Sequence, residues 1–484
     1  MQMVVILGFV LVMVLSGIEL PFAPLGPWWV IAMMMLGYLI GGYLLTKVLV
    51  WLGERKMKKV AGLHKGIGKS CAALMLIIHF YLLAGMAGVM LAGWLDLVDK
   101  KLHLGMIPLV WEMVLVFPFV LAMFLHWLAI YPLDRMVRNY IRQTSTIMAE
   151  PSLPVWSRRE FLLFHIRYDL LFAAVPIGLI ALVVDLLSLL EPIIGSVATM
   201  GMMVAGVGAI AIFTPVILVN LWRAKPLPSG HLRDRLVQLS KMIGFSFRDI
   251  VVWDSAGVVV NAAIIGFIKQ ARYVLISDAM LEHFSDDAIV AVFAHEAGHA
   301  VHHHIPYTAL FSIGWFMLMV PALQGFSAAM GVSESSAEII SVILSAALWV
   351  GVFGLLSRRF EWQADVFAAS IMSAWMQQAN SEGKSSMEQN DSKDNASLYQ
   401  LNEEGVRLFG AALQAVARLN GVEPSRRNFR HGSIRSRLDF LDKVLKGGGR
   451  KIVDRNIRRI KMLIWGLFIL GGIVTIFSYI HSCS

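Results

Sequence analysis

Residues 291–300 read AVFAHEAGHA, and their pattern is that of a helix with two histidines on one face. At about 3.6 residues per turn, His295 and His299 project from the same side one turn apart, so that two imidazoles can share one metal ion. Glu296 lies next to the first histidine, where its carboxylate can take a proton from a water that attacks a carbonyl group. The stretch therefore predicts a zinc site with a built-in general base.

The composition indicates that lipid is much of the solvent around this helix. Of 484 residues, 57% are hydrophobic and 15% are charged, and the mean hydropathy is +0.67. These values do not describe a soluble globule. The net charge of +9 is compatible with nucleic acid, but no recognisable nucleic-acid module carries it. We therefore expect a lipid bilayer and no nucleic acid among the partners.

Apolar stretches of the length needed to cross a bilayer recur along the chain. We count nine spans, at residues 2–18, 28–51, 70–95, 106–131, 169–190, 194–221, 308–330, 338–356 and 460–480. The first stretch lacks a basic flank and a cleavage site, so we interpret it as a retained span and not as a signal peptide.

Positively charged loops give the orientation, because Lys and Arg in short loops stay on the cytoplasmic side. Such residues follow the second, fourth, sixth and eighth spans, whereas loops 19–27 and 331–337 contain none. The pattern places the N-terminus inside and the C-terminus outside. Cys71 and Cys483, the only cysteines, then lie on opposite sides and cannot pair. Any metal ion must be held by histidine and carboxylate side chains.

Five segments follow from this topology. They are a six-span bundle at 1–221, a cytoplasmic part with the histidine helix at 222–307, a two-span hairpin at 308–356, a second cytoplasmic part at 357–459 and a last span at 460–484. Runs 250–254, 257–265 and 272–276 predict a small meandering sheet. Ser285 is the expected capping residue of the histidine helix. Residues 377–397 have almost no apolar content, which predicts a disordered insertion.

A catalytic zinc ion needs a third protein ligand and one open position. The segment SRRFEWQAD at 357–365 resembles the S-R-R-x-E-x-x-A-D signature that follows H-E-x-x-H in one family of membrane zinc metallopeptidases. That family comprises the CAAX prenyl endopeptidases and the heat-shock protease HtpX. The resemblance implies a metallopeptidase domain of the gluzincin type that binds one Zn²⁺ per chain. It also implies that Glu361 is the third ligand and that Asp365 orients a ligand histidine.

The resemblance extends over roughly residues 222–440 and implies three further site residues. VVVNAAIIG at 258–266 is similar to the family's N-A-x-x-x-G strand, in which Asn261 would help to hold substrate backbone as an added strand. RHGSIRSRL at 430–438 is similar to its H-P-x-x-x-x-R segment, which places His431 near a developing oxyanion and Arg437 beside the site. Gly432 stands where the family has Pro, and a polar residue at a strand bend remains an alternative for Asn261.

Other ionisable residues leave alternatives open. His302, His303 and His304 extend the histidine helix, and we interpret them as a solvated helix end. Glu112, Asp185, His79 and His126 fall inside predicted spans, where such groups are costly. They can line a wet chamber or form hydrogen bonds between helices.

The fold class is thus a mainly α-helical polytopic membrane protein with a cytoplasmic α+β zinc metallopeptidase domain. The predicted function is cleavage of membrane or membrane-associated polypeptides at the cytoplasmic face, in protein quality control at a prokaryotic inner membrane. Alternatives are processing of lipidated C-terminal peptides, a site-two type intramembrane protease, or a transporter or scaffold with a structural zinc site.

Overall fold

The computed structural model describes most of the chain and divides into two compact units. The described residues are 2–17, 27–59, 64–104, 107–148, 155–257, 259–382, 400–420, 422–426, 428–447 and 450–483. The first unit is Met1–Trp222 and the second is Arg223–Ser484.

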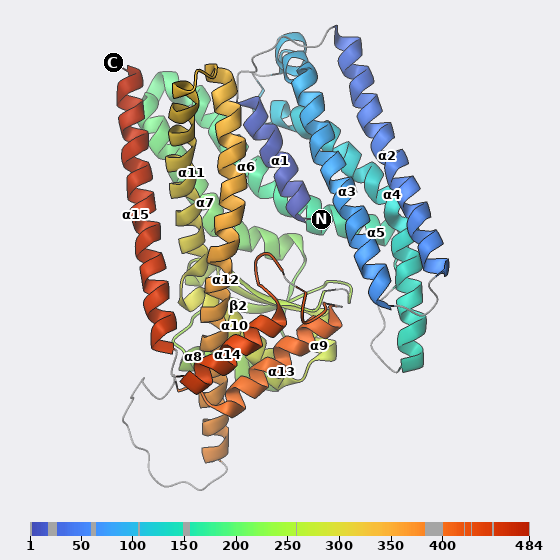
Figure 1. The fold of residues 1–484 in the computed structure, drawn as a ribbon, viewed down its shortest axis with the longest axis vertical. Helices are drawn as coiled ribbons and strands as arrows, with labels where there is room; N and C mark the ends of the chain where they lie inside the picture. The colour runs from blue at the N-terminus through green and yellow to red at the C-terminus, as the bar shows by residue number, and fades with distance from the viewer. Residues whose placement is uncertain are drawn as a thin grey trace. The chain divides into compact units, whose positions relative to one another are not determined.

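The first unit consists of helices (Figure 1). They are α1 (Gln2–Ser16), α2 (Trp28–Lys59), α3 (His64–Val89), α4 (Val110–Met148), α5 (Arg158–His165), α6 (Leu171–Ile194) and α7 (Ser196–Leu221), with π-helical turns at Met90–Trp94, Leu97–Lys101 and Ile166–Leu170. Helix α2 packs against α3 and α4, and α6 packs against α7. The buried His126 of α4 hydrogen-bonds Thr46 of α2 at 3.2 Å, so this histidine joins two helices.

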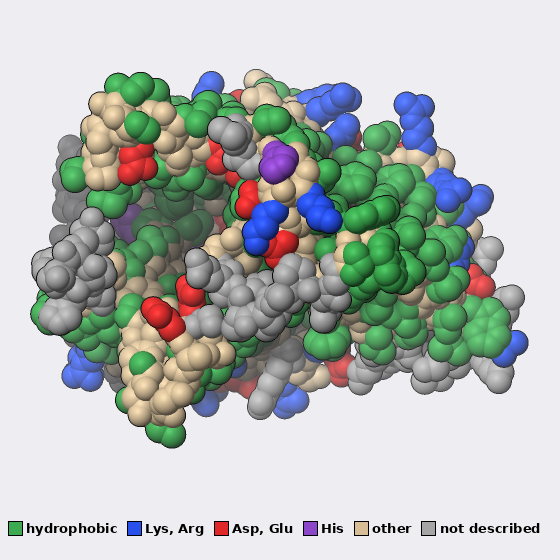
Figure 2. Space-filling view, turned by 90° about the horizontal axis from the view of Figure 1, so that it is seen from above, with side chains coloured by type: hydrophobic (Ala, Val, Ile, Leu, Met, Phe, Trp, Pro, Cys, Tyr) green, Lys and Arg blue, Asp and Glu red, His purple; other side chains and the backbone are tan. Residues whose placement is uncertain are grey.

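The fold class predicted from the sequence is confirmed, because a helix stands at each of the nine predicted spans. Eight stretches of the described chain are long and apolar enough to cross a membrane. The helix at the remaining place, α1, is apolar but has 15 residues, fewer than the roughly 20 that a crossing requires. Large hydrophobic side chains face outward on the long helices, for example Val197 at 81% and Leu463 at 72% exposure. Figure 2 shows hydrophobic side chains over much of one face. The chain is a multi-pass membrane protein.

The second unit contains a four-stranded sheet. Its strands are β1 (Lys225–Pro226), β2 (Asp249–Trp253), β3 (Ala262–Ile265) and β4 (Tyr273–Ser277), in the order β1-β2-β4-β3. The three predicted runs contain β2, β3 and β4, but the predicted meander is wrong, because β2 and β4 are parallel neighbours and β3 lies beyond β4.

Asp278 explains the departure from a meander. Its carboxylate accepts hydrogen bonds from the backbone N–H groups of Ser255 (3.1 Å) and Gly257 (2.9 Å). Gly257 has a φ of 70°, a left-handed conformation that suits glycine. The turn after β2 is thereby tied to the end of β4, and the chain continues to the far side of that strand. As a result β3 is an edge strand of the sheet.

Helices surround this sheet and extend from it (Figure 1). They are α8 (His231–Met242), α9 (Asp278–His283), α10 (Asp286–Val301), α11 (His304–Ala329), α12 (Glu334–Glu382), α13 (Glu403–Leu419), α14 (Ile434–Gly447) and α15 (Arg450–Cys483), with a 3-10 turn at Lys269–Ala271. Ser285 caps α10 as expected, since its side chain accepts a hydrogen bond from the backbone of Ala288. Helix α12 continues to Glu382, so residues 377–382 of the predicted insertion are helical, and 383–397 lie outside the described residues.

The site depends on a close approach between α10 and α12. A Cβ atom added at Gly298 of α10 would lie 3.0 Å from Cδ1 of Phe367 and 3.3 Å from Cα of Ala364, both on α12. Only glycine leaves room for contacts this short. Because Gly298 lies between the two histidines of H-E-x-x-H, the close approach brings α12 against the histidine face of α10.

Candidate active site

Three side chains from α10 and α12 converge in the second unit. His295, His299 and Glu361 each offer one ligand atom within 4.8 Å of the others. The Nε2 atoms of the two histidines are 3.2 Å apart. Glu361 Oε2 lies 3.6 Å from Nε2 of His295, and Glu361 Oε1 lies 3.6 Å from Nε2 of His299. The two motifs that stand 62 positions apart in the sequence therefore meet in the fold.

The arrangement fits a zinc ion. Bonds of about 2.0–2.2 Å to a tetrahedral zinc place neighbouring ligand atoms about 3.3–3.6 Å apart, which matches the three separations. Two imidazoles and one carboxylate are also an expected donor set for a catalytic zinc. Glu361 Oε2 is buried, and no described residue makes a hydrogen bond to it, although buried acceptors are normally paired. A cation between the three side chains would supply that partner.

Asp365 lies behind His295, in the position expected from the resemblance. Its Oδ1 is 3.0 Å from Nδ1 of His295, and its side chain is fully buried. Burial alone would lower the pKa of His295, but the nearby carboxylates of Asp365 and Glu361 outweigh it and raise the pKa to about 9. The negative charge of Asp365 and Glu361 favours a protonated imidazole. It also favours a metal cation, which displaces a proton when it binds to a histidine.

Arg437 of α14 neutralises this charge. Its Nε and Nη2 atoms bind the two oxygens of Asp365 at 2.8 and 2.5 Å, and Nη2 is also 3.4 Å from Glu361 Oε2. Burial acts to lower the pKa of Arg437, but the charges of Asp365 and Glu361 raise it. The guanidinium therefore remains charged and fixes both carboxylates.

His304 orients the second histidine, a role that the sequence interpretation missed. This residue is 2% exposed, so the prediction of a solvated helix end is wrong for His304. The chain turns sharply at His303, whose φ is 57°, and the turn folds His304 back beneath His299. His304 Nε2 is 2.9 Å from Gln363 Oε1, and its Nδ1 is 2.8 Å from Nδ1 of His299.

These contacts determine which ring nitrogens carry protons. An amide oxygen only accepts, so Nε2 of His304 donates to Gln363. A neutral His304 then accepts at Nδ1 from the Nδ1–H of His299, which leaves the Nε2 lone pair of His299 facing His295 and Glu361. Burial and the charge of His295 lower the pKa of His299 to about 3, so this imidazole is neutral.

Glu296 and the remaining candidates line one cavity of about 230 Å³ together with His295 and Glu361. Glu296 makes no hydrogen bond with another described residue, and burial raises its pKa above the usual range. Asn261, whose carbonyl accepts from the backbone of Ser277 at 3.0 Å, precedes the edge strand β3 at this cavity. His431 contributes from the segment before α14, with Nδ1 2.7 Å from Glu361 Oε1. The fold thus gathers all eight sequence-predicted site residues at one place.

Comparisons with known proteins agree with this geometry. Residues 226–401 match the protein family described as Peptidase family M48. This part of the chain is similar to the peptidase domain of that family. The match includes both zinc-ligand motifs, and the family resemblance predicted from those motifs is confirmed.

Relatives of the M48 domain occur in plants. The chain is 29% identical over 175 residues to the CAAX prenyl protease 1 homolog of Oryza sativa subsp. japonica and 30% identical over 174 residues to that of Arabidopsis thaliana. Each alignment covers 32% of this chain, and 40% and 41% of those proteins. The fold is similar to the crystal structure of S. mikatae Ste24p, with a TM-score of 0.50, 17% identity and coverage of 87% of this chain and all of that one. The likeness therefore extends to the membrane helices.

Replacing Glu361 by Ala tests its place in the metal site. We expect zinc content after purification to fall from about one ion per chain to well below half, since two histidines alone leave a zinc ion without its third protein ligand. Metal analysis of the purified full chain measures this, with Glu404→Ala on α13 as a control that keeps full zinc. A Glu361→Ala protein with full zinc occupancy would remove Glu361 from the ligand set.

Proposed function

We propose that this protein is an integral membrane zinc endopeptidase that cleaves membrane or membrane-associated polypeptides at the cytoplasmic face. The observation that carries the proposal is the convergence of His295, His299 and Glu361 at zinc-ligand separations, with the unpaired carboxylate of Glu296 in the same cavity. A structural zinc site is normally closed by four protein ligands. Three ligands beside a free carboxylate favour catalysis over a transporter or scaffold.

Different residues of the chain have different roles in hydrolysis. Zinc held by the three ligands would polarise the scissile carbonyl and activate a water molecule. Glu296 takes a proton from the attacking water on its carboxylate and returns it to the nitrogen of the leaving amine. Burial raises the pKa of this carboxyl group above its usual range, which makes the carboxylate a stronger proton acceptor. His431 donates a hydrogen bond toward the negative charge that develops on the carbonyl oxygen.

A substrate in extended conformation would add to the sheet at β3. This edge strand pairs only with β4 among the described strands, and Asn261 at its start borders the cavity. Backbone hydrogen bonds along such an edge bind a peptide without reading its sequence. The apolar side chains of Val292, Leu413 and Val416 line the same cavity and would accept one side chain of the substrate.

The size of this cavity supports protein quality control over processing of lipidated C-terminal peptides. About 230 Å³ is smaller than the roughly 300–1,000 Å³ typical of pockets for drug-sized ligands. It accommodates an amino-acid side chain more readily than a long prenyl chain. The alternative is favoured by the relatives' description as CAAX prenyl protease 1 homologs. The positive loops support a cytoplasmic site, with the N-terminus inside, and the low cysteine content favours a prokaryotic inner membrane.

Two substrates distinguish these functions. The purified, zinc-loaded full chain is incubated with an unfolded membrane protein and, separately, with a farnesylated C-terminal peptide, and fragments are identified by mass spectrometry. We expect cleavage of the unfolded protein, because edge-strand binding requires only an extended backbone. We expect little or no cleavage of the peptide, because the cavity of about 230 Å³ is small for its prenyl chain. Selective cleavage of the farnesylated peptide would instead establish the processing function. Zinc binding with cleavage of neither substrate would point to a scaffold.

A further inference from the structure

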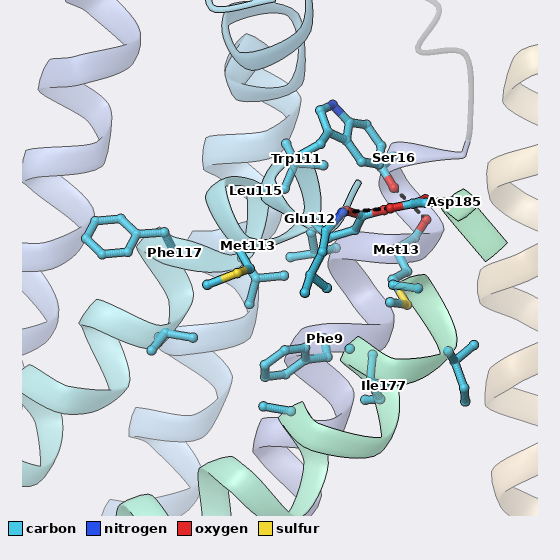
Figure 3. A pocket seen from close by; sticks show the side chains of 18 of the residues that line it. Phe9, Met13, Ser16, Trp111, Glu112, Met113, Leu115, Phe117, Ile177 and Asp185 are labelled. Atoms are coloured by element: carbon cyan, nitrogen blue, oxygen red, sulfur yellow. Dashed lines mark hydrogen bonds between the residues drawn. The ribbon is translucent and has the colours of Figure 1, made fainter. Parts of the chain in front are cut away.

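A second cavity belongs to the first unit, whereas the zinc ligands belong to the second. It is lined mainly by residues of α1, α4 and α6 and has a volume of about 530 Å³, within the roughly 300–1,000 Å³ range of ligand pockets. Most of its lining is apolar, as Figure 3 shows with Phe9, Met113 and Ile177. A cavity of this size among membrane helices has room for a hydrocarbon chain.

One end of this cavity carries two carboxyl groups. Glu112 of α4 and Asp185 of α6 both line this end of the cavity and lie close together in Figure 3. Glu112 Oε2 is buried, and no described residue forms a hydrogen bond with it. Two carboxylates in contact repel each other unless a proton or a cation lies between them. A proton or a cation is therefore needed to stabilise the two carboxyl groups.

The backbone at the start of α4 holds this pair in place. The N–H of Leu109 donates a hydrogen bond of 2.8 Å to Asp185 Oδ2. Leu109 has a φ of 65°, a conformation that is unfavourable for a leucine and persists only where its surroundings enforce it. This strained turn starts α4 and places Glu112 in the first turn of that helix. The hydrogen bond from Leu109 thus fixes the position of Asp185, although the conformation of Leu109 that it requires is energetically unfavourable.

A smaller cavity of about 280 Å³ adjoins the same pair from the other side. It shares Trp111, Glu112 and Asp185 with the large cavity and adds Asp99 and Ser188. The carboxyl pair therefore borders both cavities, and the smaller one has the larger share of polar lining. Because Glu112 lies at the start of the candidate span Val110–Asn139, we expect the pair to lie near a membrane boundary.

The charges around both cavities select the ligand. Among the described residues, the lining of both cavities includes three acids and no lysine, arginine or histidine. A phosphate or carboxylate head group would meet only like charge here, whereas an ammonium group would find two acceptors. We propose that the large cavity binds a membrane amphiphile with a protonated amine head between Glu112 and Asp185 and a single alkyl chain along α1, α4 and α6.

Dodecylamine is the probe for this site. The purified full chain in a nonionic detergent is titrated with dodecylamine and followed by native mass spectrometry, alongside dodecanol, which has the same chain without charge, and hexylamine, which has the same head on a short chain. We expect saturable binding of one dodecylamine per chain, and at least about tenfold weaker binding of the other two compounds, because each lacks one of the two recognised features.

Matched variants assign the binding to this cavity. Glu112→Gln and Asp185→Asn keep the shape of each side chain, and each should weaken dodecylamine binding at least about tenfold. Glu191→Gln removes the same charge from an exposed position on α6 outside both cavities and should change binding by less than about twofold. Gly178→Leu fills the large cavity, where Gly178 has only Leu109 Cδ1 nearby at 3.8 Å, and should exclude the alkyl chain.

Three outcomes would overturn the proposal. Dodecanol binding as tightly as dodecylamine would show an apolar crevice without head-group recognition. Unchanged dodecylamine binding in both Glu112→Gln and Asp185→Asn would place the amine elsewhere, and absence of any saturable binding would mean that the carboxyl pair only shares a proton. The thermal unfolding of each variant without ligand shows whether it is folded, so that lost binding is not mistaken for lost structure.

Discussion

Replacing Glu296 by Gln is expected to abolish peptide cleavage while zinc binding remains. The amide has the size of the carboxylate but cannot accept a proton from water, and general acid–base catalysis contributes roughly 10²- to 10⁴-fold to a rate. Glu296 is not among the three residues at zinc-ligand separations, so its replacement leaves the metal site intact. The release of fragments from an unfolded membrane protein or a casein-like substrate measures cleavage, and metal analysis of the same sample measures zinc.

Glu282→Gln is the matched control for this substitution. Glu282 lies on α9 in the same unit with a side chain that is 71% exposed, and the charge lost is identical. We expect wild-type cleavage from this control. If Glu296→Gln cleaved as fast as the wild type with one zinc per chain, the proposed general base would be wrong. If it lost both zinc and cleavage, the residue would instead be needed to build the metal site.

The inactive Glu296→Gln protein also serves as a substrate trap. With zinc in place and the proton acceptor removed, a bound polypeptide would remain on the enzyme. Membrane proteins that copurify with this variant, compared with those that copurify with Glu282→Gln, would identify the substrates. Because the control differs in one exposed side chain, proteins captured by both variants can be set aside.

The parts of this fold that the sequence predicts are those with a strong local signal. A membrane helix is a continuous apolar stretch, because its backbone polar groups must be satisfied within the segment, and a helix stands at each of the nine predicted spans. The histidine helix is equally local, since Ser285 caps it and the two histidines repeat at one turn. The position of Glu361 followed from a motif resemblance, and its side chain lies beside both histidines.

The parts that were missed depend on contacts between distant residues. The parallel pairing of β2 and β4 rests on Asp278 holding the turn after β2, which strand propensity does not reveal. His304 is buried only because the chain turns at His303, a non-glycine residue with positive φ. Its partner Gln363 lies 59 positions away on α12. The one available signal for a buried His304 was Gln363 within SRRFEWQAD, a polar residue that is buried and binds His304.

Replacing Arg437 by Met is expected to destabilise the second unit by about 3–5 kcal/mol, because it leaves the buried carboxylate of Asp365 without its partner. The Asp365 side chain is 0% exposed and that of Arg437 is 6% exposed, so water cannot replace the guanidinium. Lys446→Met on the same helix breaks an exposed pair with Asp442 and should cause no measurable change. Denaturant midpoints of the full chain in detergent, followed by tryptophan fluorescence, provide the comparison.

A double variant separates stability from function at this pair. Arg437→Met combined with Asp365→Leu removes both charges, and replacing a whole buried ion pair by apolar side chains is often neutral or stabilising. We therefore expect most of the lost stability to return. Zinc affinity should nevertheless stay reduced by about 10- to 100-fold, because His295 loses the carboxylate that faces its Nδ1 atom at 3.0 Å. Recovery of both stability and zinc affinity would mean that Asp365 serves only to pair with Arg437. Recovery of stability alone would show that apolar side chains can replace the Arg437–Asp365 pair without loss of stability. The pair would then serve to orient the metal ligand His295.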